Sequence, residues 1–377
     1  MGCRDRGLAA RGPGLDQADR RRHPRRRPGH RAQVLRRRAQ DQPRRPRAHR
    51  SLLPAPAPHL SGVVAREVPR ADIEEEVRRA LPAHGGITQV RPLLKGHGHQ
   101  SFVLETGSRA TVLLKIALRM DQAAKMKSLG RVLDLAARHR VPVPRLLHVS
   151  EGTASFEGRP WLIQEYLAGD DGEEALAGMS APQRAAFFRD FGAAVARLHA
   201  VDVGYFSDDS TWASRETTWA SAVESRLARL AVEHRHAALL PPDDLKVAAT
   251  TIRSLARAVS AAVRPALVHR DLYLPNTLVT AGRFRALLDF EHARSADALS
   301  DFVKLRMWVF DVVPGSESEF CAGYGTNPWT TTEGRRRHHV SLGLELLSGL
   351  LYWKRTGQSE MLGDYQRRFG EWSASID

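Results

Sequence analysis

Asp271, Asn276 and Asp289 carry side chains that can serve a single reaction. The carboxylate of Asp271 can orient and deprotonate a hydroxyl group. The amide oxygen of Asn276 and the carboxylate of Asp289 are hard ligands of the kind that Mg²⁺ takes together with phosphate oxygens. In phosphoryl transfer the protein mainly positions the nucleophile and neutralises charge through the metal. These residue types, in this order, therefore indicate transfer of a phosphoryl group to an alcohol.

The stretch that carries these residues, 267–291, alternates apolar runs with polar turns. The apolar runs at 266–268 and 277–279 predict two strands, and residues 284–288 predict a third after a turn at 281–283. The polar residues then fall on loops at the ends of the strands. A polar turn followed by an ordinary hairpin is the alternative, and the Asp-Phe pair after the last strand argues against it.

The motif HRDLYLPN at 269–276, followed by LLDFE at 287–291, resembles the aminoglycoside phosphotransferase and choline kinase family, which is related to the protein kinases. Most members of that family have glycine where Arg270 stands, so Arg270 is similar to the HRD of protein kinases. Tyr273, however, stands where protein kinases usually carry lysine, and Glu291 stands where they carry glycine. Because the chain also lacks an A-P-E segment, the resemblance favours the small-molecule branch.

The resemblance implies an α+β, two-lobed protein-kinase-like fold, with a small N-lobe on an antiparallel sheet and a larger, mostly helical C-lobe. Residues 64–168 would form the nucleotide-binding N-lobe, and residues 169–377 the catalytic and substrate-binding C-lobe. ATP would be the phosphoryl donor, Asp271 the catalytic base, and Mg²⁺ the metal held by Asn276 and Asp289. The residues expected to support the catalytic loop are His269, Arg270 and Asp301. Those expected to contact the acceptor are Tyr273, Glu291 and Trp308.

A glycine-containing turn and a lysine within a strand precede this motif. The turn, KGHGHQ at 95–100, lies between strands expected at 87–94 and 101–105, and Lys115 lies in a third strand at 111–116. Backbone amides of such a turn can approach phosphates, and lysine can reach their oxygens as a point charge. An ordinary turn and an edge-strand lysine that faces water are the alternatives. Residues expected to contact the nucleotide phosphates are Gly96, Gly98, His99 and Lys115.

The helix expected at 121–140 raises the question of what pairs with Lys115. Kinase-like proteins usually present a glutamate from this helix to the strand lysine. The matching position falls near Leu129 and Gly130, and the only acidic residues in the helix are Asp121 and Asp134. The partner of Lys115 therefore stays open.

Prolines at 142 and 144 end this helix and start an extended segment. Strands are expected at 146–149 and 161–164, before a loop that begins at Glu165. The resemblance implies that this loop connects the two lobes. It also implies that main-chain groups of Glu165, Tyr166 and Leu167 bind an adenine; an ordinary strand-to-helix loop is the alternative.

The remaining chain is predicted to be mostly helical. The expected helices are 71–83, 181–200, 244–263, 298–310, 335–355 and 361–372, with an irregular and then helical segment across 201–240. The expected substrate region, 201–260, holds 8 Asp and Glu against 7 Arg and Lys. A polycationic aminoglycoside should be met by a surplus of carboxylates, so this balance does not favour a strongly cationic acceptor. The family implies an antibiotic acceptor, and a metabolite alcohol of the choline, homoserine or sugar type fits as well.

Most of the basic charge lies at the N-terminus. The net charge is +15, and residues 1–50 supply 17 Arg against 4 Asp, or +13, so the remainder carries only +2. A nearly neutral body gives no support for nucleic-acid binding. Two alternatives to a small-molecule kinase remain. One is a protein kinase, indicated by Arg270, and the other is a non-catalytic nucleic-acid-binding protein that uses the Arg-rich tail.

Cysteine usage and hydropathy bear on location. The only cysteines, Cys3 and Cys321, imply no disulfide framework. No apolar run is long enough to span a membrane, and the N-terminus lacks the apolar segment of a secretory signal. We therefore expect a cytoplasmic protein without a membrane partner. The sequence does not indicate an oligomeric state.

Residues 1–63 are rich in Arg, Pro and Ala and are predicted to be a disordered tail or a mis-assigned start. Their GC-rich codon usage favours a natural start near Val63 or Val64. N-terminal sequencing of the natively expressed protein should therefore begin near these residues. Recovery of Met1 as the first residue would contradict this hypothesis.

Overall fold

The structure, a computed structural model, describes residues 67–93 and 99–375. All of these residues belong to one compact unit that spans residues 50–377. Gly96, Gly98 and the tail at 1–63 lie outside the described residues. The lobe boundary expected near residue 168 stays a prediction.

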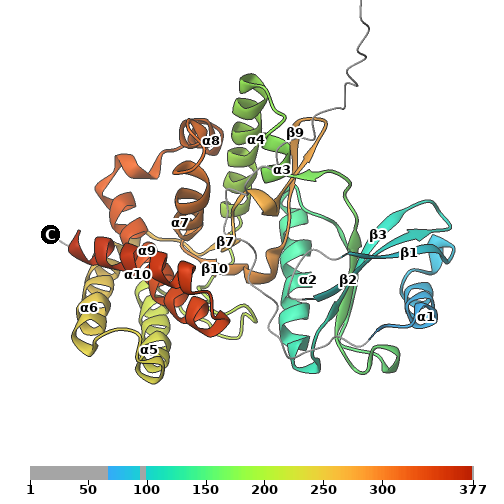
Figure 1. The fold of residues 1–377 in the computed structure, drawn as a ribbon, viewed down its shortest axis with the longest axis horizontal. Coiled ribbons are helices and arrows are strands. Elements are labelled where there is room, and N and C mark those ends of the chain that lie inside the picture. The colour runs from blue at the N-terminus through green and yellow to red at the C-terminus, as the bar shows by residue number, and fades with distance from the viewer. Residues whose placement is uncertain (1–66, 94–98, 376–377) are drawn as a thin grey trace, which may run out of the picture. The chain divides into compact units, whose positions relative to one another are not determined.

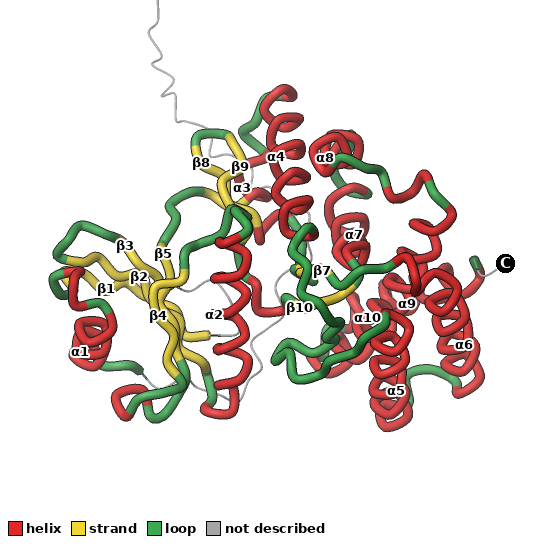
Figure 2. Tube along the Cα trace, turned by 180° about the vertical axis from the view of Figure 1, so that it is seen from behind, coloured by secondary structure: helices red, strands yellow, loops and turns green. Residues whose placement is uncertain are grey.

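A five-stranded antiparallel sheet, in the order β1-β2-β3-β5-β4, positions Lys115. Along β3, alternate side chains point to opposite faces of the sheet. Val112, Leu114 and Ile116 pack into a core with helix α1, whereas Ala117 belongs to the core that includes helix α2. Helices α1 and α2 lie on opposite sides of the sheet (Figure 1). Figure 2 shows the same arrangement from behind, with α2 alongside the sheet. The elements are α1 (Arg70–Ala80), β1 (Ile87–Leu93), β2 (His99–Thr106), β3 (Thr111–Ala117), α2 (Ala123–Arg138), β4 (Leu146–Ser150) and β5 (Trp161–Glu165).

Helices dominate the described chain after residue 169. They are α3 (Gly172–Leu176), α4 (Ala181–His199), α5 (Trp219–Ala237), α6 (Pro242–Val259), α7 (Asp301–Leu305), α8 (Ser316–Tyr324), α9 (Thr332–Thr356) and α10 (Ser359–Ala374). One apolar core joins α2 and α4 to the strands, and a second lies among α5, α6, α9 and α10. None of the helices within the described ranges combines the length and apolarity that crossing a membrane requires.

Short strands bring the two motif-bearing loops together. They are β6 (Asp170–Asp171), β7 (Ala266–Val268), β8 (Thr277–Thr280), β9 (Arg283–Leu287) and β10 (Arg294–Ala296). β7 pairs with β10, and β8 lies between β6 and β9. The HRDLYLPN loop therefore leaves β7 and enters β8, while the Asp-Phe-Glu loop leaves β9 and enters β10. Because these strands pair, the two loops must lie side by side.

The helix predicted at 298–310 is the least uniform of the expected elements. It begins as a 3₁₀ turn at Ala298–Ser300, continues as α7, and widens into a π-helix at Arg306–Phe310. A π-helical turn is rare and is often found near functional sites. Sequence periodicity does not separate these helix types, because each segment is only three to five residues long. Helix α8 and the strands β6 and β10 had no clear sequence signal.

Helices α4 and α8 approach each other closely through two glycines. A Cβ atom at Gly192 would overlap the carbonyl oxygen of Phe320, and one at Gly323 would overlap the carbonyl oxygen of Arg189. The same surfaces meet in a buried cluster of aromatic rings that includes Phe191. The absence of side chains at these two positions therefore sets the distance between the helices.

We predict that Gly192→Ala and Gly323→Ala each destabilise the protein by about 1–3 kcal/mol, because the helices must separate to admit the methyl group. Gly363→Ala in α10 is the matched control, since a Cβ there meets no atom within 4 Å. That change should stabilise the helix by roughly 0.5–1 kcal/mol. Chemical denaturation measures all three, and equal effects at Gly192 and Gly363 would contradict the packing argument.

Candidate active site

The loop at 269–276 is held by one buried carboxylate. Asp301, at the start of α7, is 1% exposed. Its Oδ2 accepts a hydrogen bond from the His269 N–H at 2.8 Å, and its Oδ1 accepts one from the Arg270 N–H at 2.6 Å. Oδ2 also lies 3.0 Å from Nε2 of His199 in α4. The main chain of the loop is therefore attached to α7 through successive N–H groups.

Arg270 takes a left-handed main-chain conformation, with φ at 68°. Residues other than glycine rarely do so, because the Cβ atom crowds the backbone. The hydrogen bonds to Asp301 offset that cost, so an arginine is tolerated where the family that the motif resembles usually has glycine. Its side chain lies near the Ser300 carbonyl oxygen at 3.5 Å and near Oε2 of Glu345 at 3.3 Å.

Both carboxylate oxygens of Asp271 are engaged. Oδ2 accepts a hydrogen bond from Nδ2 of Asn276 at 3.0 Å, and Oδ1 accepts one from Nζ of Lys304 at 2.6 Å. Burial alone would raise the pKa of Asp271, but the nearby charges of Lys304 and His292 hold it below its ordinary value. Asp271 is therefore ionised near neutral pH, as a general base must be.

Asn276 and Asp289 come from the two neighbouring loops. Nε2 of His269 lies 2.7 Å from the Leu288 carbonyl oxygen, and the Leu288 N–H donates to the Asn276 carbonyl oxygen at 2.9 Å. These contacts fix the second loop against the first. His269, which is fully buried, thus supports the loops and does not face an open site.

The donor set fits a magnesium ion. Oδ1 of Asp289 is buried, and no described residue forms a hydrogen bond with it. The amide nitrogen of Asn276 donates to Asp271, so its amide oxygen remains for another partner. Within residues 67–93 and 99–375 there is no group of three or more His, Cys, Asp or Glu arranged to hold a metal. Few protein ligands are what Mg²⁺ requires when phosphates supply further oxygens.

Lys115 pairs with carboxylates of the second loop. Its Nζ lies 3.6 Å from Oδ1 of Asp289 and 3.8 Å from Oε1 of Glu291. Burial would lower the pKa of Lys115, but these carboxylates raise it above its ordinary value. The side chain is 15% exposed, and β3 is the central strand, so the alternative of an edge-strand lysine facing water is excluded.

Glu291 contacts basic side chains from the sheet and from α2. Its carboxylate lies 2.6 Å from Nδ1 of His99 and 3.5 Å from Nζ of Lys125. Burial would raise the pKa of Glu291, but His99 and the lysines hold it well below its ordinary range. Glu291 thus lies with the residues expected to bind phosphate. None of these contacts supports its expected role in binding the acceptor.

The loop after β5 retains one free main-chain donor within the described residues. The N–H of Glu165 donates to the Arg145 carbonyl oxygen, and the N–H of Tyr166 donates to that of Thr111. No described residue accepts a hydrogen bond from the N–H of Leu167. Of the three residues expected to meet an adenine, Leu167 is therefore the one with an available N–H.

Tyr273 and Trp308, the other two residues expected to contact the acceptor, lie in different surroundings. Tyr273 is half-buried beside Asp271, and burial together with that negative charge raises the pKa of its hydroxyl group. Trp308 lies in the π-helix and packs against the α9 and α10 core, with the Arg368 guanidinium 5.7 Å from its ring. Tyr273 is thus close to the expected base, whereas Trp308 packs against other helices of the described chain.

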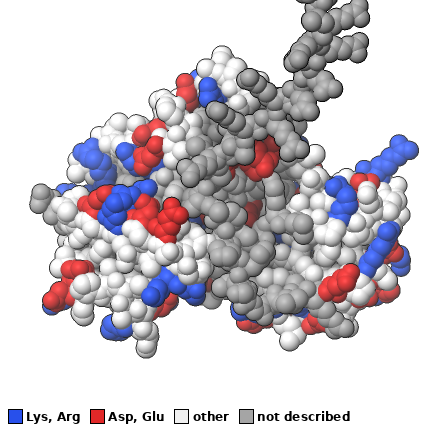
Figure 3. Space-filling view, viewed as in Figure 1, with Lys and Arg blue, Asp and Glu red and all other residues white. Residues whose placement is uncertain are grey.

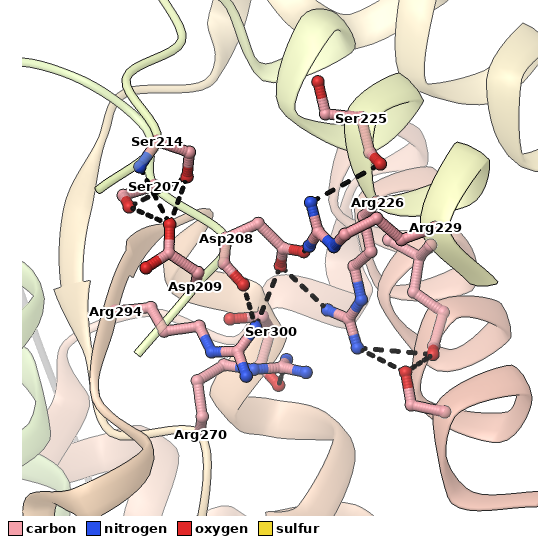
Figure 4. Close-up of polar contacts among 12 residues, drawn as sticks. Ser207, Asp208, Asp209, Ser214, Ser225, Arg226, Arg229, Arg270, Arg294 and Ser300 are labelled. Carbon is pink, nitrogen blue, oxygen red and sulfur yellow. Dashed lines mark hydrogen bonds and ion pairs between the residues drawn. The ribbon is translucent and has the colours of Figure 1, made fainter. Parts of the chain in front are cut away.

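Several charged residues of the expected substrate region pair with one another. Asp208 pairs with Arg226, Arg229 and Arg294, beside Arg270 (Figure 4). Asp209 accepts hydrogen bonds from main-chain and hydroxyl groups, including those of Ser214. On the described surface in view in Figure 3, positive and negative side chains are interspersed. The expectation that the folded body does not bind nucleic acid stays a prediction.

Lys304, Lys125 and Glu345 are residues of this site that sequence reasoning missed. Lys304 contacts Asp271, Lys125 contacts Glu291, and Glu345 contacts Arg270. Each lies within a helix, where a charged residue usually faces solvent. No spacing rule connects them to the motif. The one available signal was the lack of an acidic residue in α2 near Lys115.

Solved structures with a similar fold include aminoglycoside phosphotransferases. A thermostable mutant of the aminoglycoside phosphotransferase APH(4)-Ia, in complex with ADP and hygromycin B, is 17% identical at a TM-score of 0.60, over 81% of this chain and 98% of that chain. The GDP complex of aminoglycoside 2'-phosphotransferase-IIIa is 16% identical at 0.58, over 81% and 98%. The gentamicin complex of APH(2")-IIa is 16% identical at 0.54, over 80% and 96%. No curated protein matches the chain.

The fold is therefore the two-lobed, protein-kinase-like α+β fold that was expected, with an antiparallel sheet in the small N-lobe and a mostly helical C-lobe. Residues 89–339, more than half of the chain, match the phosphotransferase enzyme family. The chain belongs to this family. It is a small-molecule phosphotransferase with an alcohol group as acceptor, and the family resemblance is confirmed.

We predict that Asp301→Asn destabilises the protein by about 3 kcal/mol, because asparagine offers one acceptor oxygen where several buried donors need two. Burial would raise the pKa of Asp301, but His199 and the loop hydrogen bonds lower it. The carboxylate thus stabilises the fold above an ordinary aspartate pKa of about 3.9, and this contribution is lost as the pH falls through its folded-state value.

Urea denaturation should therefore show a difference in the free energy of unfolding between wild type and Asp301→Asn. This difference should be smaller at acidic pH than at neutral pH. Asp190→Asn is the control, because Asp190 forms an exposed pair with Arg283 and should change stability by less than about 1 kcal/mol. A gap that stays constant down to the acid limit would contradict this assignment.

Proposed function

We propose that this protein transfers the γ-phosphoryl group of ATP, in the presence of Mg²⁺, to a hydroxyl group of a small-molecule antibiotic. The supporting observation is the convergence of Asp271, Asn276, Asp289 and Lys115 on two adjacent loops and one sheet face. Such a set supplies a base, metal ligands and a phosphate-binding cation. Membership of the phosphotransferase enzyme family supports the same reaction class.

Asp271 is proposed as the base. The acceptor hydroxyl donates a hydrogen bond to its carboxylate and gives up the proton as the new O–P bond forms. The bond between the γ-phosphorus and the bridging oxygen breaks, and its electron pair leaves with the nucleoside diphosphate. Lys115 and His99 would hold phosphate oxygens, and the N–H of Leu167 would donate a hydrogen bond to the adenine ring. A bound Mg²⁺ supplies neutralisation of phosphate charge, with Asn276 and Asp289 as its protein ligands.

The acceptor is proposed to be neutral or weakly basic. Of the acidic residues in 201–260, several are already occupied within the protein: Asp202, Asp208, Asp209, Glu216 and Glu224. A polycationic aminoglycoside needs carboxylates that are free to pair with its ammonium groups. Because these carboxylates are already engaged within the protein, they favour a hydroxylated antibiotic with little charge as the acceptor. The same observation favours a metabolite alcohol as the second candidate.

The test is ATP consumption, with Mg²⁺ present, across hydroxylated antibiotics of increasing charge and a set of metabolite alcohols. We expect turnover with a neutral or weakly basic antibiotic and weaker turnover with polycationic aminoglycosides. Mass spectrometry should find one added phosphate on the acceptor. Turnover restricted to metabolite alcohols would replace the antibiotic with the second candidate.

The Asp271→Ala variant provides the internal control for the chemistry. It should lose turnover by at least about 10²-fold, because base catalysis contributes on the order of 10²–10⁴. Its affinity for ATP should stay within a few fold, since Asp271 is not among the proposed nucleotide contacts. Full activity in this variant would refute the proposed role of Asp271.

A further inference from the structure

Helix α7 contributes a lysine to the site, in addition to the aspartate that holds the loop. Nζ of Lys304 lies 2.6 Å from Oδ1 of Asp271, a charge-assisted hydrogen bond of normal length. The side chains of Lys304 and Asp271 are 25% and 19% exposed. Because water screens such a largely buried pair only in part, its electrostatic effect exceeds that of a surface ion pair.

Lys304 is held in its charged form. Burial would lower its pKa, but Asp271 and then Glu345 raise it above its ordinary value. Glu345 of α9 is itself buried and also pairs with Arg270 at 3.3 Å. Acidic and basic side chains therefore alternate from α9 to the loop, and Lys304 stands between two carboxylates.

The loop itself has no described side chain that forms an ion pair with the Asp271 carboxylate, although His292 and the loop residue His269 also lower the pKa of Asp271. The Arg270 side chain is directed to Glu345 and Ser300, and position 273 carries an uncharged tyrosine. Asn276 binds Oδ2 of Asp271 through a neutral amide. Among the described residues, Lys304 is thus the cation that hydrogen-bonds this carboxylate.

We propose that Lys304 is a positioning residue for phosphoryl transfer: its ammonium group fixes the plane of the Asp271 carboxylate for the acceptor hydroxyl. The inference rests on the proposed role of Asp271 as base. A carboxylate has about four lone-pair directions, so the bonds to Lys304 and Asn276 leave room for the hydroxyl proton. Helix α7 thereby supplies both the anchor of the loop, Asp301, and the cation that orients its base.

The test compares Lys304→Gln, Lys304→Met and Lys304→Arg with wild type, using MgATP and an acceptor phosphorylated in the panel, or water as acceptor in MgATP hydrolysis. Glutamine keeps a hydrogen-bond donor without the charge, methionine removes both, and arginine keeps the charge. At neutral pH we expect kcat to fall about 10²-fold or more in the two neutral variants, within the range for loss of an effective base. The KM for ATP should change less than about threefold, because a group that acts only on the base leaves ground-state binding intact.

Rescue by the conservative variant separates positioning from a purely structural role. Lys304→Arg keeps a cationic hydrogen-bond donor and should retain most of the wild-type kcat, whereas the two neutral variants lose it with the KM for ATP nearly unchanged. Loss of folded protein alone would not restore kcat in the arginine variant while sparing KM in the neutral ones. Lys246→Met, at an exposed position in α6, is the control and should leave the rate unchanged.

The outcomes distinguish the two proposals. Activity in Asp271→Ala would refute the base and with it this inference. An inactive Asp271→Ala together with neutral Lys304 variants that keep the wild-type kcat would overturn this inference alone. In the Asp271→Ala background, Lys304→Met should cause little further loss, because the two groups act as a unit.

A second measurement covers the case in which the neutral variants do not fold. A crystal structure of the wild-type protein with a non-hydrolysable MgATP analogue shows the two side chains directly. Nζ of Lys304 is expected within hydrogen-bond distance of Oδ1 of Asp271. A separation beyond about 3.5 Å would overturn the proposal.

Discussion

The buried carboxylate of Asp301 is the constraint on which the geometry of the site depends. It accepts hydrogen bonds from the main chain of His269 and Arg270 and from the ring of His199. A carboxylate that is 1% exposed is costly to bury unless its oxygens are satisfied, so these donors and Asp301 stabilise one another. The left-handed conformation at Arg270 persists because this network over-determines it. Asp271 follows directly, and its direction is set by that turn.

The second constraint is electrostatic and lies between the sheet and the loop after β9. Asp289 and Glu291 both lie close to Lys115 of the sheet, and Glu291 also contacts His99 and Lys125. Helix α2 therefore contributes a cation, Lys125, to this network and not the glutamate that kinase-like proteins usually present. The partner carboxylates of Lys115 come from the same loop that carries the proposed metal ligand. A phosphate or metal that binds there would change the balance of charge for all of these groups at once.

Charged side chains in the region expected to meet the acceptor also pair with one another. Asp208 lies among Arg226, Arg229 and Arg294, and burial together with the neighbouring arginines lowers the pKa of Arg226 to about 10. Asp208 and Arg226 are largely buried and pair with each other, whereas Arg229 remains about half exposed. A count of charges along the sequence therefore overstates what an acceptor encounters, which is why the acceptor is proposed to carry little charge.

The sequence by itself determined the reaction class, because the types and spacing of Asp271, Asn276 and Asp289 are dictated by the chemistry of phosphoryl transfer and metal binding. It also determined most elements, since Lys115 sits in a strand with alternating apolar neighbours and the longer helices have clear apolar faces. Only the tertiary structure decided which distant charges meet these residues. Lys304 reaches Asp271 across 33 positions, and Lys125 reaches Glu291 across 166. Long-range pairs of this kind leave no periodic signal, because each is fixed by how helices pack and not by local spacing.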